Sequence, residues 1–396
     1  MFYEDNNTAK LLDMEDVIVK KVENSAEEVH IFIELPRKMQ SCPRCGRETN
    51  RVHDYREQKI KDVPFGRTTY LYLRKRRYSC EHCGKRFAEK NPLVPRYYRL
   101  TRRCVVSIIQ QLKKLVSATE VARNHNVSVT SVFRYFKPIS YSCAELPEVL
   151  SIDEFKGDTG GEKYQTILTD VRNRVVQDIL PNRTEQSLKE YFLGFENRNH
   201  VKYFVCDMNS HFRSVAKECF PDAKIIADRY HVTRQAIWAM EAVRKAEQKK
   251  YSAKFRRYFK HSRVLLNKDF LSDEEKVNLS VMFENAPRLA EAYRLKNLFL
   301  EVMHTKNDSE MAAKKLSDWF MAAEEAAFRK ENPLPEFRAC ITAYHNWSDE
   351  ILNSLNIPYS NGYTEGCNNK TKVLKRVCFG LRNFERFRSR ILHCSC

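Results

Sequence analysis

The chain has 396 residues, with 69 lysines and arginines against 51 aspartates and glutamates, a formal net charge of +18. This length predicts several domains, and the positive charge favours a polyanionic partner such as nucleic acid. No apolar run approaches the roughly 20 residues of a membrane span, and the start MFYEDNNTAK lacks the pattern of a secretory signal. We therefore expect an intracellular, cytoplasmic protein with no membrane partner.

The cysteines predict a zinc site near the N-terminus. Two β-like runs (17–22 and 29–35) precede the knuckles CPRCG and CEHCG, and the segment between the knuckles alternates as strands do. Two CxxC pairs can complete one tetrahedral zinc site, and disulfides are rare inside cells. We predict a zinc ribbon with the ligands Cys42, Cys45, Cys80 and Cys83. His53 and His82 are alternative ligands, although four sulfurs suffice.

Basic residues lie between the two cysteine pairs. Lysine and arginine side chains bind DNA by neutralising its phosphates. We expect the ribbon to grip a DNA backbone with Arg74, Lys75, Arg76 and Arg77. A protein contact is the alternative for this surface.

Residues 101–137 read as helical and contain a helix-turn-helix pattern. Ser117 and Glu120 have the spacing of a capping box, Asn126 tolerates left-handed backbone, and Ser128 can cap a second helix. The second helix of such a motif enters the major groove of DNA. It would present Thr130, Ser131 and Arg134. A helical hairpin without DNA contact is the alternative.

From residue 149 onward, short apolar strands replace this pattern. EVLSIDEF, YQTILTDV and RVVQDIL form a predicted meander, which is followed by a helix near 184–193, the strand VKYFVCD, a helix at 210–219 and the strand AKIIAD. This order predicts a mixed sheet covered by helices. Residues 232–350 contain no glycine and read as almost wholly helical, with breaks near Pro287 and Pro335.

Three carboxylates stand in this second region: Asp153 in VLSIDEF, Asp207 in YFVCDMNS and Glu365 in NGYTEGCNN. Acids embedded in apolar strands are less easily explained as solvated surface charges. If their strands are parallel neighbours, Asp153 and Asp207 meet at one sheet edge. Carboxylates are the ligands of Mg²⁺, and two such ions can act on the two oxygens of a phosphodiester displacement. The pattern indicates an enzyme that cuts or joins DNA.

Glu365 opens a predicted helix with two different faces. Val373, Leu374 and Val377 would face the core. The other face would contact DNA through Asn369, Lys372 and Arg376.

The order of zinc ribbon, helix-turn-helix, SIDEF, VCDMNS, IIADRYHV and YSNGYTEGCNNKTKVLKR resembles the bacterial insertion-sequence transposases of the ISL-three family. The resemblance covers residues 40–393. It implies a ribonuclease-H-like catalytic domain whose DDE triad is Asp153, Asp207 and Glu365, with a helical insertion before the glutamate. Asp228 and His231 match an Asp-x-x-His element near the active site, where His231 either orients a phosphate or DNA strand or braces the fold. Glu154 and Asp170 are rivals for the first acid.

The expected fold is therefore multidomain α+β. Its parts are a β-rich zinc ribbon domain (1–100), a helix-turn-helix segment (101–137), a linker (138–148), the first part of a ribonuclease-H-like mixed-sheet domain (149–231), a helical insertion (232–350) and a C-terminal part carrying the glutamate helix (351–396).

The resemblance implies a DDE transposase that cleaves the terminal inverted repeats of an insertion sequence and transfers the strands to target DNA. It would use two Mg²⁺ ions, for which Mn²⁺ can substitute, and structural zinc, and would work as a homodimer or larger synaptic assembly. The alternative is a transposase-derived DNA-binding regulator without cleavage. A metal-dependent endonuclease without strand transfer is a third reading.

Overall fold

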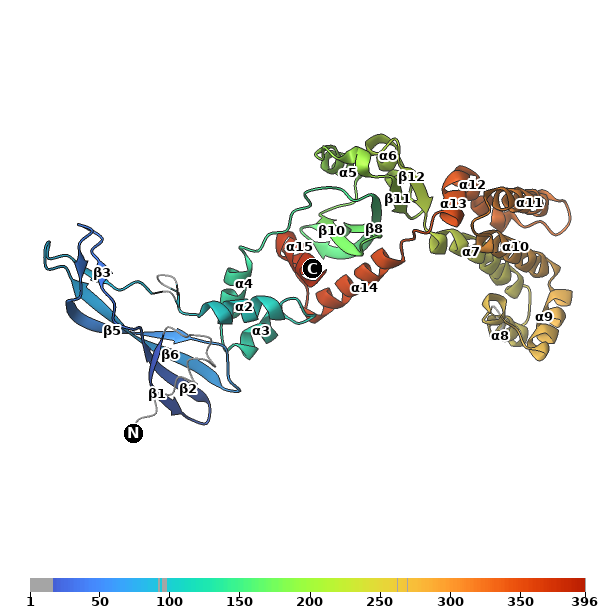
Figure 1. Ribbon diagram of the computed structural model, residues 1–396. Coiled ribbons are helices and arrows are strands. Elements are labelled where there is room, and N and C mark those ends of the chain that lie inside the picture. Colours follow the sequence, from blue (N-terminus) through green and yellow to red (C-terminus); the bar gives the residue numbers. More distant parts are fainter. Residues whose placement is uncertain (1–16, 92, 95–97, 262, 269, 396) are drawn as a thin grey trace. The chain divides into compact units, whose positions relative to one another are not determined.

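The computed structural model describes residues 17–91, 93, 94, 98–261, 263–268 and 270–395 (Figure 1). The chain forms two compact units. The first comprises residues 1–141 with 373–381, and the second comprises residues 142–372 with 382–396. Among the described residues, none of the helices combines the length and the apolar character that crossing a membrane requires.

The first unit contains a five-stranded sheet. Its strands are β1 (Ile18–Asn24), β2 (Glu28–Glu34), β5 (Val52–Lys61), β6 (Thr68–Ser79) and β7 (Arg86–Ala88), and a separate small ladder joins β3 (Gln40–Ser41) to β4 (Glu48–Thr49). β1 and β2 form the predicted antiparallel hairpin, β2 runs parallel to β6, and β5 and β7 are antiparallel to β6. Alternate residues such as Ile31, Ile33, Leu71 and Leu73 are buried on one face, as the period of two predicts.

Three short helices follow: α2 (Arg102–Gln111), α3 (Ala118–Asn124) and α4 (Val129–Phe136). Each begins at a hydroxyl side chain that accepts a backbone N–H of the first turn, namely Thr101, Ser117 and Ser128. The helices share a core that includes Cys104, Ile108, Val121, Val132 and Phe136.

The second unit is built around a five-stranded sheet of order β10-β9-β8-β11-β12. Its strands are β8 (Val149–Thr159), β9 (Glu162–Asp170), β10 (Val175–Leu180), β11 (Tyr203–Cys206) and β12 (Lys224–Ala227). β8, β9 and β10 form the predicted antiparallel meander, and β11 lies parallel to both β8 and β12. The predicted mixed sheet is confirmed.

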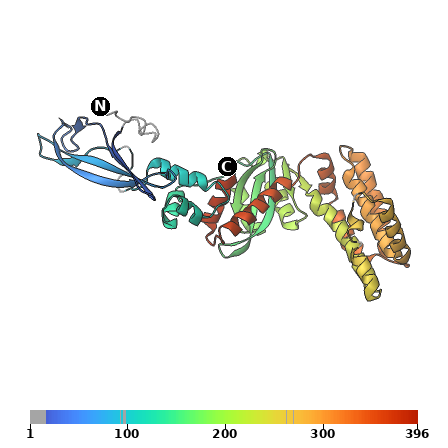
Figure 2. The same ribbon diagram turned by 90° about the horizontal axis from the view of Figure 1, so that it is seen from below.

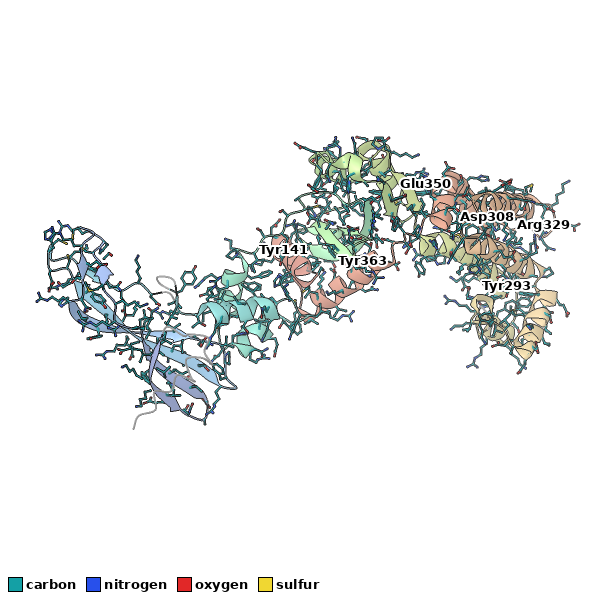
Figure 3. The ribbon with its side chains drawn as sticks, in the orientation of Figure 1. Tyr141, Tyr293, Asp308, Arg329, Glu350 and Tyr363 are labelled. Carbon is teal, nitrogen blue, oxygen red and sulfur yellow. The ribbon has the colours of Figure 1, made fainter. Side chains whose placement is uncertain are left out.

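Helices lie over the two faces of this sheet (Figures 1 and 2). On one face, Ile152 and Phe204 share a core with Leu188 and Phe212 of the helices α5 (Glu185–Leu193) and α6 (Ser210–Cys219). On the other face lies α14 (Gly362–Val377), whose first residues belong to this unit and whose last belong to the first unit. The hydroxyl of Tyr363 donates to the carbonyl of Arg174 at 2.7 Å (Figure 3). The chain ends in α15 (Phe384–Ser395), which packs against β10.

The region between β12 and α14 is helical, as predicted. It contains α7 (Arg229–Gln248), α8 (Ala253–His261), α9 (Asp273–Asn285), α10 (Pro287–His304), α11 (Ser309–Phe328), α12 (Arg338–Asn346) and α13 (Ser348–Asn356). Two short 3₁₀ helices, η2 (Leu265–Asn267) and η3 (Pro335–Phe337), lie in this region, and a third, η1 (Arg198–His200), precedes β11. The breaks fall where the prolines predict them, because Pro287 begins α10 and Pro335 begins η3.

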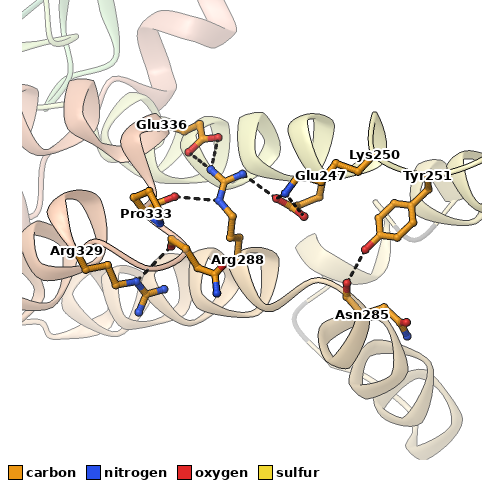
Figure 4. Close-up of polar contacts among 9 residues, drawn as sticks. Glu247, Lys250, Tyr251, Asn285, Arg288, Arg329, Pro333 and Glu336 are labelled. Carbon is orange, nitrogen blue, oxygen red and sulfur yellow. Dashed lines mark hydrogen bonds and ion pairs between the residues drawn. The ribbon is translucent and has the colours of Figure 1, made fainter.

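One arginine joins three of these helical segments (Figure 4). The guanidinium of Arg288 in α10 contacts the carboxylate of Glu247 in α7 at 2.7 Å and that of Glu336 in η3 at 2.8 Å, and it donates to the carbonyl of Pro333 at 2.9 Å. These contacts are partly shielded from solvent, so the loss of this arginine would remove the ion pair of Glu336 and leave Glu247 with Lys250.

Candidate functional site

The four predicted zinc ligands lie together. The sulfur atoms of Cys42 and Cys83 are 3.6 Å apart, as are those of Cys45 and Cys80, and all four lie within 4.8 Å of one another. Four thiolates about 2.3 Å from one zinc ion are about 3.8 Å apart, so the arrangement fits tetrahedral zinc. His82 instead contacts Arg47 through Nδ1 at 3.0 Å. This cluster has the arrangement of a four-cysteine zinc ribbon.

The two knuckles have the same backbone geometry. The amides of Gly46 and Gly84 each donate to the carbonyl of the first cysteine of their pair at 2.9 Å, with φ of +72° and +69°. Left-handed backbone favours glycine, which explains the CxxCG spacing in both pairs.

The four basic residues 74–77 of β6 differ in their exposure to solvent. Arg74 is exposed, whereas Arg77 is half-buried and pairs with Asp54 at 2.9 Å. Arg76 is 5% exposed, and its guanidinium lies 3.4 Å from Glu89 and 3.5 Å from Glu34. The expectation that Arg76 contacts DNA is therefore corrected, because Glu34 and Glu89 hold its guanidinium in a buried ion-pair network. Lys75 is half-buried, and its ammonium donates to the side chain of Gln58 at 2.5 Å.

Helices α3 and α4 are joined by a turn with Asn126 at φ +49°. Thr130 and Arg134 are exposed on α4, whereas the hydroxyl of Ser131 lies 2.9 Å from that of the capping Ser128. Only half of the predicted capping box forms. Ser117 accepts the amide of Glu120 at 3.0 Å, but the Glu120 carboxylate pairs with Arg123.

Three aspartates stand at the same level on the three parallel strands of the second sheet. Val205 of β11 pairs with Ser151 of β8, so two further residues along bring Asp207 opposite Asp153. Cys206 pairs with Ala227 of β12, so the next residues, Asp207 and Asp228, are also opposite. The carboxyl ends of β11 and β12 thus deliver Asp207 and Asp228 to the level of Asp153, which lies within β8.

Asp153 is 8% exposed and is held by two donors. Its Oδ1 accepts the amide of Glu154 at 2.7 Å, and its Oδ2 accepts the side-chain amide of Asn368 at 2.8 Å. Burial, together with the charge of Glu365, raises the pKa of Asp153 to about 6.

The carboxylate of Asp207 has fewer hydrogen-bond donors than that of Asp153. Its buried Oδ1 has no hydrogen-bond partner among the described residues. Burial, and then the charges of Asp153, Glu154 and Asp228, raise the pKa of Asp207 to about 7. The Oδ1 oxygen is buried without a hydrogen-bond donor from the described part of the chain and faces other carboxylates. A bound cation would supply a ligand bond in place of the missing hydrogen bond and would offset the repulsion between the negative charges.

Glu365 reaches this level of the sheet from α14, which presents a polar face to the sheet. Thr364, Asn368 and Thr371, spaced at i, i+4 and i+7, are 0%, 4% and 3% exposed. The hydroxyl of Thr364 lies 2.8 Å from that of Thr169, and it donates to Ser151 at 2.9 Å. The Glu365 side chain is 40% exposed.

The rest of α14 follows the prediction in part. Leu374 is buried, as predicted, but Val373 is 43% exposed, which corrects the expectation that it faces the core. The exposed residues include the three predicted DNA contacts Asn369, Lys372 and Arg376.

Asp228 and His231 connect α7 to α14. Asp228 caps α7, accepting the amide of His231 at 3.4 Å, and its other oxygen accepts the amide of Asn361 at 3.2 Å. Arg234 lies with Nη2 3.2 Å from Nδ1 of His231, and burial lowers the pKa of this histidine. Because arginine can only donate, Nδ1 accepts and the proton of the neutral ring is on Nε2, 3.9 Å from Glu365. Asp228, His231 and Glu365 offer ligand atoms within 4.8 Å of one another, but this tautomer favours a brace over a metal ligand.

The two rival acids are engaged elsewhere. Glu154 alternates with Asp153 on β8 and pairs with Arg183. Asp170 accepts the amide and the side chain of Asn173 at 3.0 and 2.7 Å.

Sequence reasoning missed Asn361, Thr364 and Asn368. Asn361 is fully buried and accepts the Ser151 hydroxyl at 2.6 Å. The signal available for all three was their place within four residues of Glu365, on the helix face that a period of 3.6 aligns with it.

Comparison with known proteins agrees with this geometry. Residues 150–391, more than half of the chain, match the ISL3 group of DDE transposases, described as "Transposase". Residues 38–83 match the "zinc-finger of transposase IS204/IS1001/IS1096/IS1165". The chain belongs to the ISL3 family of DDE transposases and is a DNA-transposing enzyme. It is 26% identical over 379 residues to the transposase for insertion sequence element IS1001 of Bordetella parapertussis, covering 92% of this chain and 91% of that protein.

Proposed function

We propose that this transposase cleaves the ends of an insertion sequence and transfers the freed strands to target DNA, with Asp153, Asp207 and Glu365 as its catalytic carboxylates. The observation that carries the proposal is the strand register that places Asp153 and Asp207 opposite each other beneath the helix of Glu365. The strand order of the second sheet, an antiparallel meander of three strands followed by two strands parallel to β8, supports a ribonuclease-H-like domain.

The donor set suits Mg²⁺. Every candidate ligand is a carboxylate, and the orphaned Oδ1 of Asp207 has room for a ligand bond in place of a hydrogen bond. Two such ions, when bound, would activate the attacking oxygen and stabilise the leaving oxygen at phosphorus. Mn²⁺ can substitute.

The residues of the chain hold this site in shape. Asn368 fixes the Asp153 carboxylate by donating to Oδ2, which leaves Oδ1 with a single backbone donor. Asp228 ties the start of α14 to the start of α7 through the amide of Asn361, and His231 directs its Nε2 proton at Glu365. These contacts keep the exposed glutamate beside the buried aspartates, and no covalent enzyme intermediate is required.

The remaining parts supply DNA binding in this proposal. The zinc ribbon would contact the backbone through Arg74, Lys75 and Arg77. The helix-turn-helix formed by α3 and α4 would read the terminal inverted repeats through Thr130 and Arg134, with Ser131 fixed at the cap. Asn369, Lys372 and Arg376 would hold DNA near the catalytic centre. Because transposition joins two ends, we propose a homodimer or larger synaptic assembly. The domain limits expected from the sequence stand as part of this proposal.

Substitutions at the acidic edge test the chemistry. Asp153→Asn, Asp207→Asn and Glu365→Gln each keep side-chain shape while removing a metal-binding charge. Each should lower the rate of Mg²⁺-dependent strand cleavage and joining by at least about 1000-fold, in line with losses of key electrostatic groups in other enzymes. Binding to element ends should change little.

Glu154→Gln is the matched control, because it removes a neighbouring carboxylate that pairs with Arg183. Its cleavage rate should stay within about threefold of the parent's rate, as expected of a group outside the metal site. Full cleavage by Asp153→Asn together with loss in Glu154→Gln would shift the triad by one residue. Parent-like cleavage by all four variants would instead favour a DNA-binding regulator.

A further inference from the structure

Helix α7 follows β12 directly and so begins at the acidic edge (Figure 1). It carries an exposed aromatic and cationic face. Tyr230 and Trp238 are 58% and 53% exposed, and Arg234 lies between them at i+4. The guanidinium carbon of Arg234 is 5.3 Å from the Tyr230 ring centroid and 4.4 Å from that of Trp238. We name these three residues the α7 ladder. Leaving two large aromatic side chains in water forgoes the stabilisation of burial, which suggests that a ligand covers them.

The ladder borders a hollow of about 250 Å³. Besides the ladder, its lining consists of Thr233, Ile237 and Glu241 of α7, and of Arg263 and Asn267 from the segment that precedes α9. The volume lies below the roughly 300–1,000 Å³ of pockets for drug-sized ligands, so it suits one planar group.

The ladder is connected to the candidate catalytic centre through one contact. Nη2 of Arg234 lies 3.2 Å from Nδ1 of His231, whose Nε2 is 3.9 Å from Glu365. Trp238 follows His231 by seven residues, a rise of about 10 Å along the helix. That rise spans about three nucleotide steps of one DNA strand. A base in the hollow would therefore belong to a nucleotide close to the phosphate being cleaved.

The chemistry of the ladder selects the occupant. Aromatic rings and arginine planes stack on nucleobases whatever the base, whereas paired bases in a duplex hide their faces from such rings. Arg234 of the wall complements the negative backbone that carries the base, whereas Arg263 lies 3.7 Å from the carboxylate of Glu241. We propose that the α7 ladder and its hollow hold one unpaired DNA base, turned out of the duplex beside the cleavage site. This inference rests on the proposed function, since it places the base relative to the cleaved strand.

Intrinsic fluorescence offers a direct reporter of this site. Of the three tryptophans in the chain, all of them described, Trp319 and Trp347 are 1% and 5% exposed, so Trp238 dominates quenching by acrylamide. The probes are two DNA duplexes of one sequence, fully paired or carrying a single bulged nucleotide, added to full-length protein without divalent cations. The bulged duplex should bind about tenfold more tightly, within the range for one stacked base. It should also shield Trp238 from acrylamide.

Variants test the assignment. Trp238→Ala should abolish the preference for the bulged duplex, and Trp238→Phe should keep most of it. The matched control is Phe328→Ala on α11, because Phe328 is 64% exposed and also lies beneath an arginine, with Arg338 4.6 Å from its ring, but lies outside the hollow. This control should retain the parent's preference.

Three results would overturn the inference. The first is an unchanged bulge preference in Trp238→Ala, and the second is equal binding of both duplexes by the parent. The third is a change of oligomeric state in Trp238→Ala, seen by light scattering, with the preference intact, which would assign the ladder to a second copy of the chain. Because cleavage is not measured, failure of the carboxylate variants would leave this result standing, and the reverse holds as well.

Discussion

The acidic edge shows how single residues acquire function from their neighbours. Asp153 is buried and Asp207 opposite it is half-buried, and desolvation raises the pKa of both, to about 6 and about 7. The two carboxylates differ in support, because Asp153 accepts two hydrogen bonds whereas Oδ1 of Asp207 accepts none from the described residues. Without a cation, this edge costs folding free energy whenever both aspartates are ionised.

The raised pKa values predict a pH dependence of stability. An unfolded aspartate titrates near 3.9, so between about pH 4 and pH 7 the folded protein binds more protons than the unfolded chain does. The free energy of unfolding should therefore fall as pH rises through this window. The thermal midpoint, measured without divalent cations at pH 5 and pH 8, should be lower at pH 8 by a few degrees.

Asp207→Asn should remove much of this difference, whereas Glu196→Gln, which alters an exposed carboxylate, should keep it. Mg²⁺ added at pH 8 should raise the midpoint of the parent but not that of Asp207→Asn. A parent midpoint that climbs steadily from pH 5 to pH 8 would contradict the shifted aspartates.

Among the elements, β6 and α14 contain polar and charged side chains with structural roles that the sequence did not predict. β6 buries Arg76 between Glu34 and Glu89, while Arg74, two residues earlier on the same face, stays at the surface. α14 turns threonine and asparagine toward the sheet and keeps its basic residues outside. In both elements some charged or polar side chains serve the fold, while others remain available to a ligand.

The DNA-binding proposal predicts that substitutions on α4 and on β6 have different effects, the first on sequence discrimination and the second on overall affinity. Arg134→Ala on α4 should reduce discrimination between a terminal-repeat duplex and a random duplex by about 10-fold or more, as loss of a base contact does. Neutralising Arg74 and Arg77 on β6 should weaken both complexes alike and lower the salt dependence by about one unit per phosphate contact. Titrations of both duplexes across salt concentrations separate the two outcomes.

Arg76 is excluded from that set because its replacement would break a buried ion pair. Arg76→Met should lower the thermal midpoint before it alters DNA binding. Equal losses on both duplexes in Arg134→Ala would show that α4 is not the sequence reader.

At the scale of the whole molecule, zinc links distant parts of the first unit. The two cysteine pairs are separated by strands β5 and β6, so one ion closes a long loop of the chain. Structural zinc sites stabilise folding directly, because the unfolded chain has no preformed site.

Purified protein should therefore contain about one zinc per chain, as a four-cysteine site does. The double variant Cys42→Ser/Cys45→Ser should lose that zinc, measured by elemental analysis, and should bind element ends more weakly. Cys143→Ser, outside the cluster, should retain both properties. Unchanged zinc content in the double variant would refute the assignment.

The sequence by itself determined the local features. CxxCG spacing, alternating strands, helix caps and proline breaks depend on residues a few positions apart, and the structure reproduces the zinc cluster, the meander and the helical region from them. The family resemblance extended this to Asp153, Asp207 and Glu365 as candidate catalytic residues, a role that the geometry supports and the proposed variants test.

Only the tertiary structure decided which residues meet across long stretches of chain. The alignment of Asp153, Asp207 and Asp228 depends on the register of strands that are about 50 and 20 residues apart in sequence, and side-chain patterns do not specify such pairing. The buried polar face of α14 was missed because threonine and asparagine usually indicate solvent, yet here they find partners on β8 and β9. Arg76 was misassigned for the same reason, since burial of a charge becomes favourable only where distant carboxylates such as Glu34 and Glu89 are brought beside it.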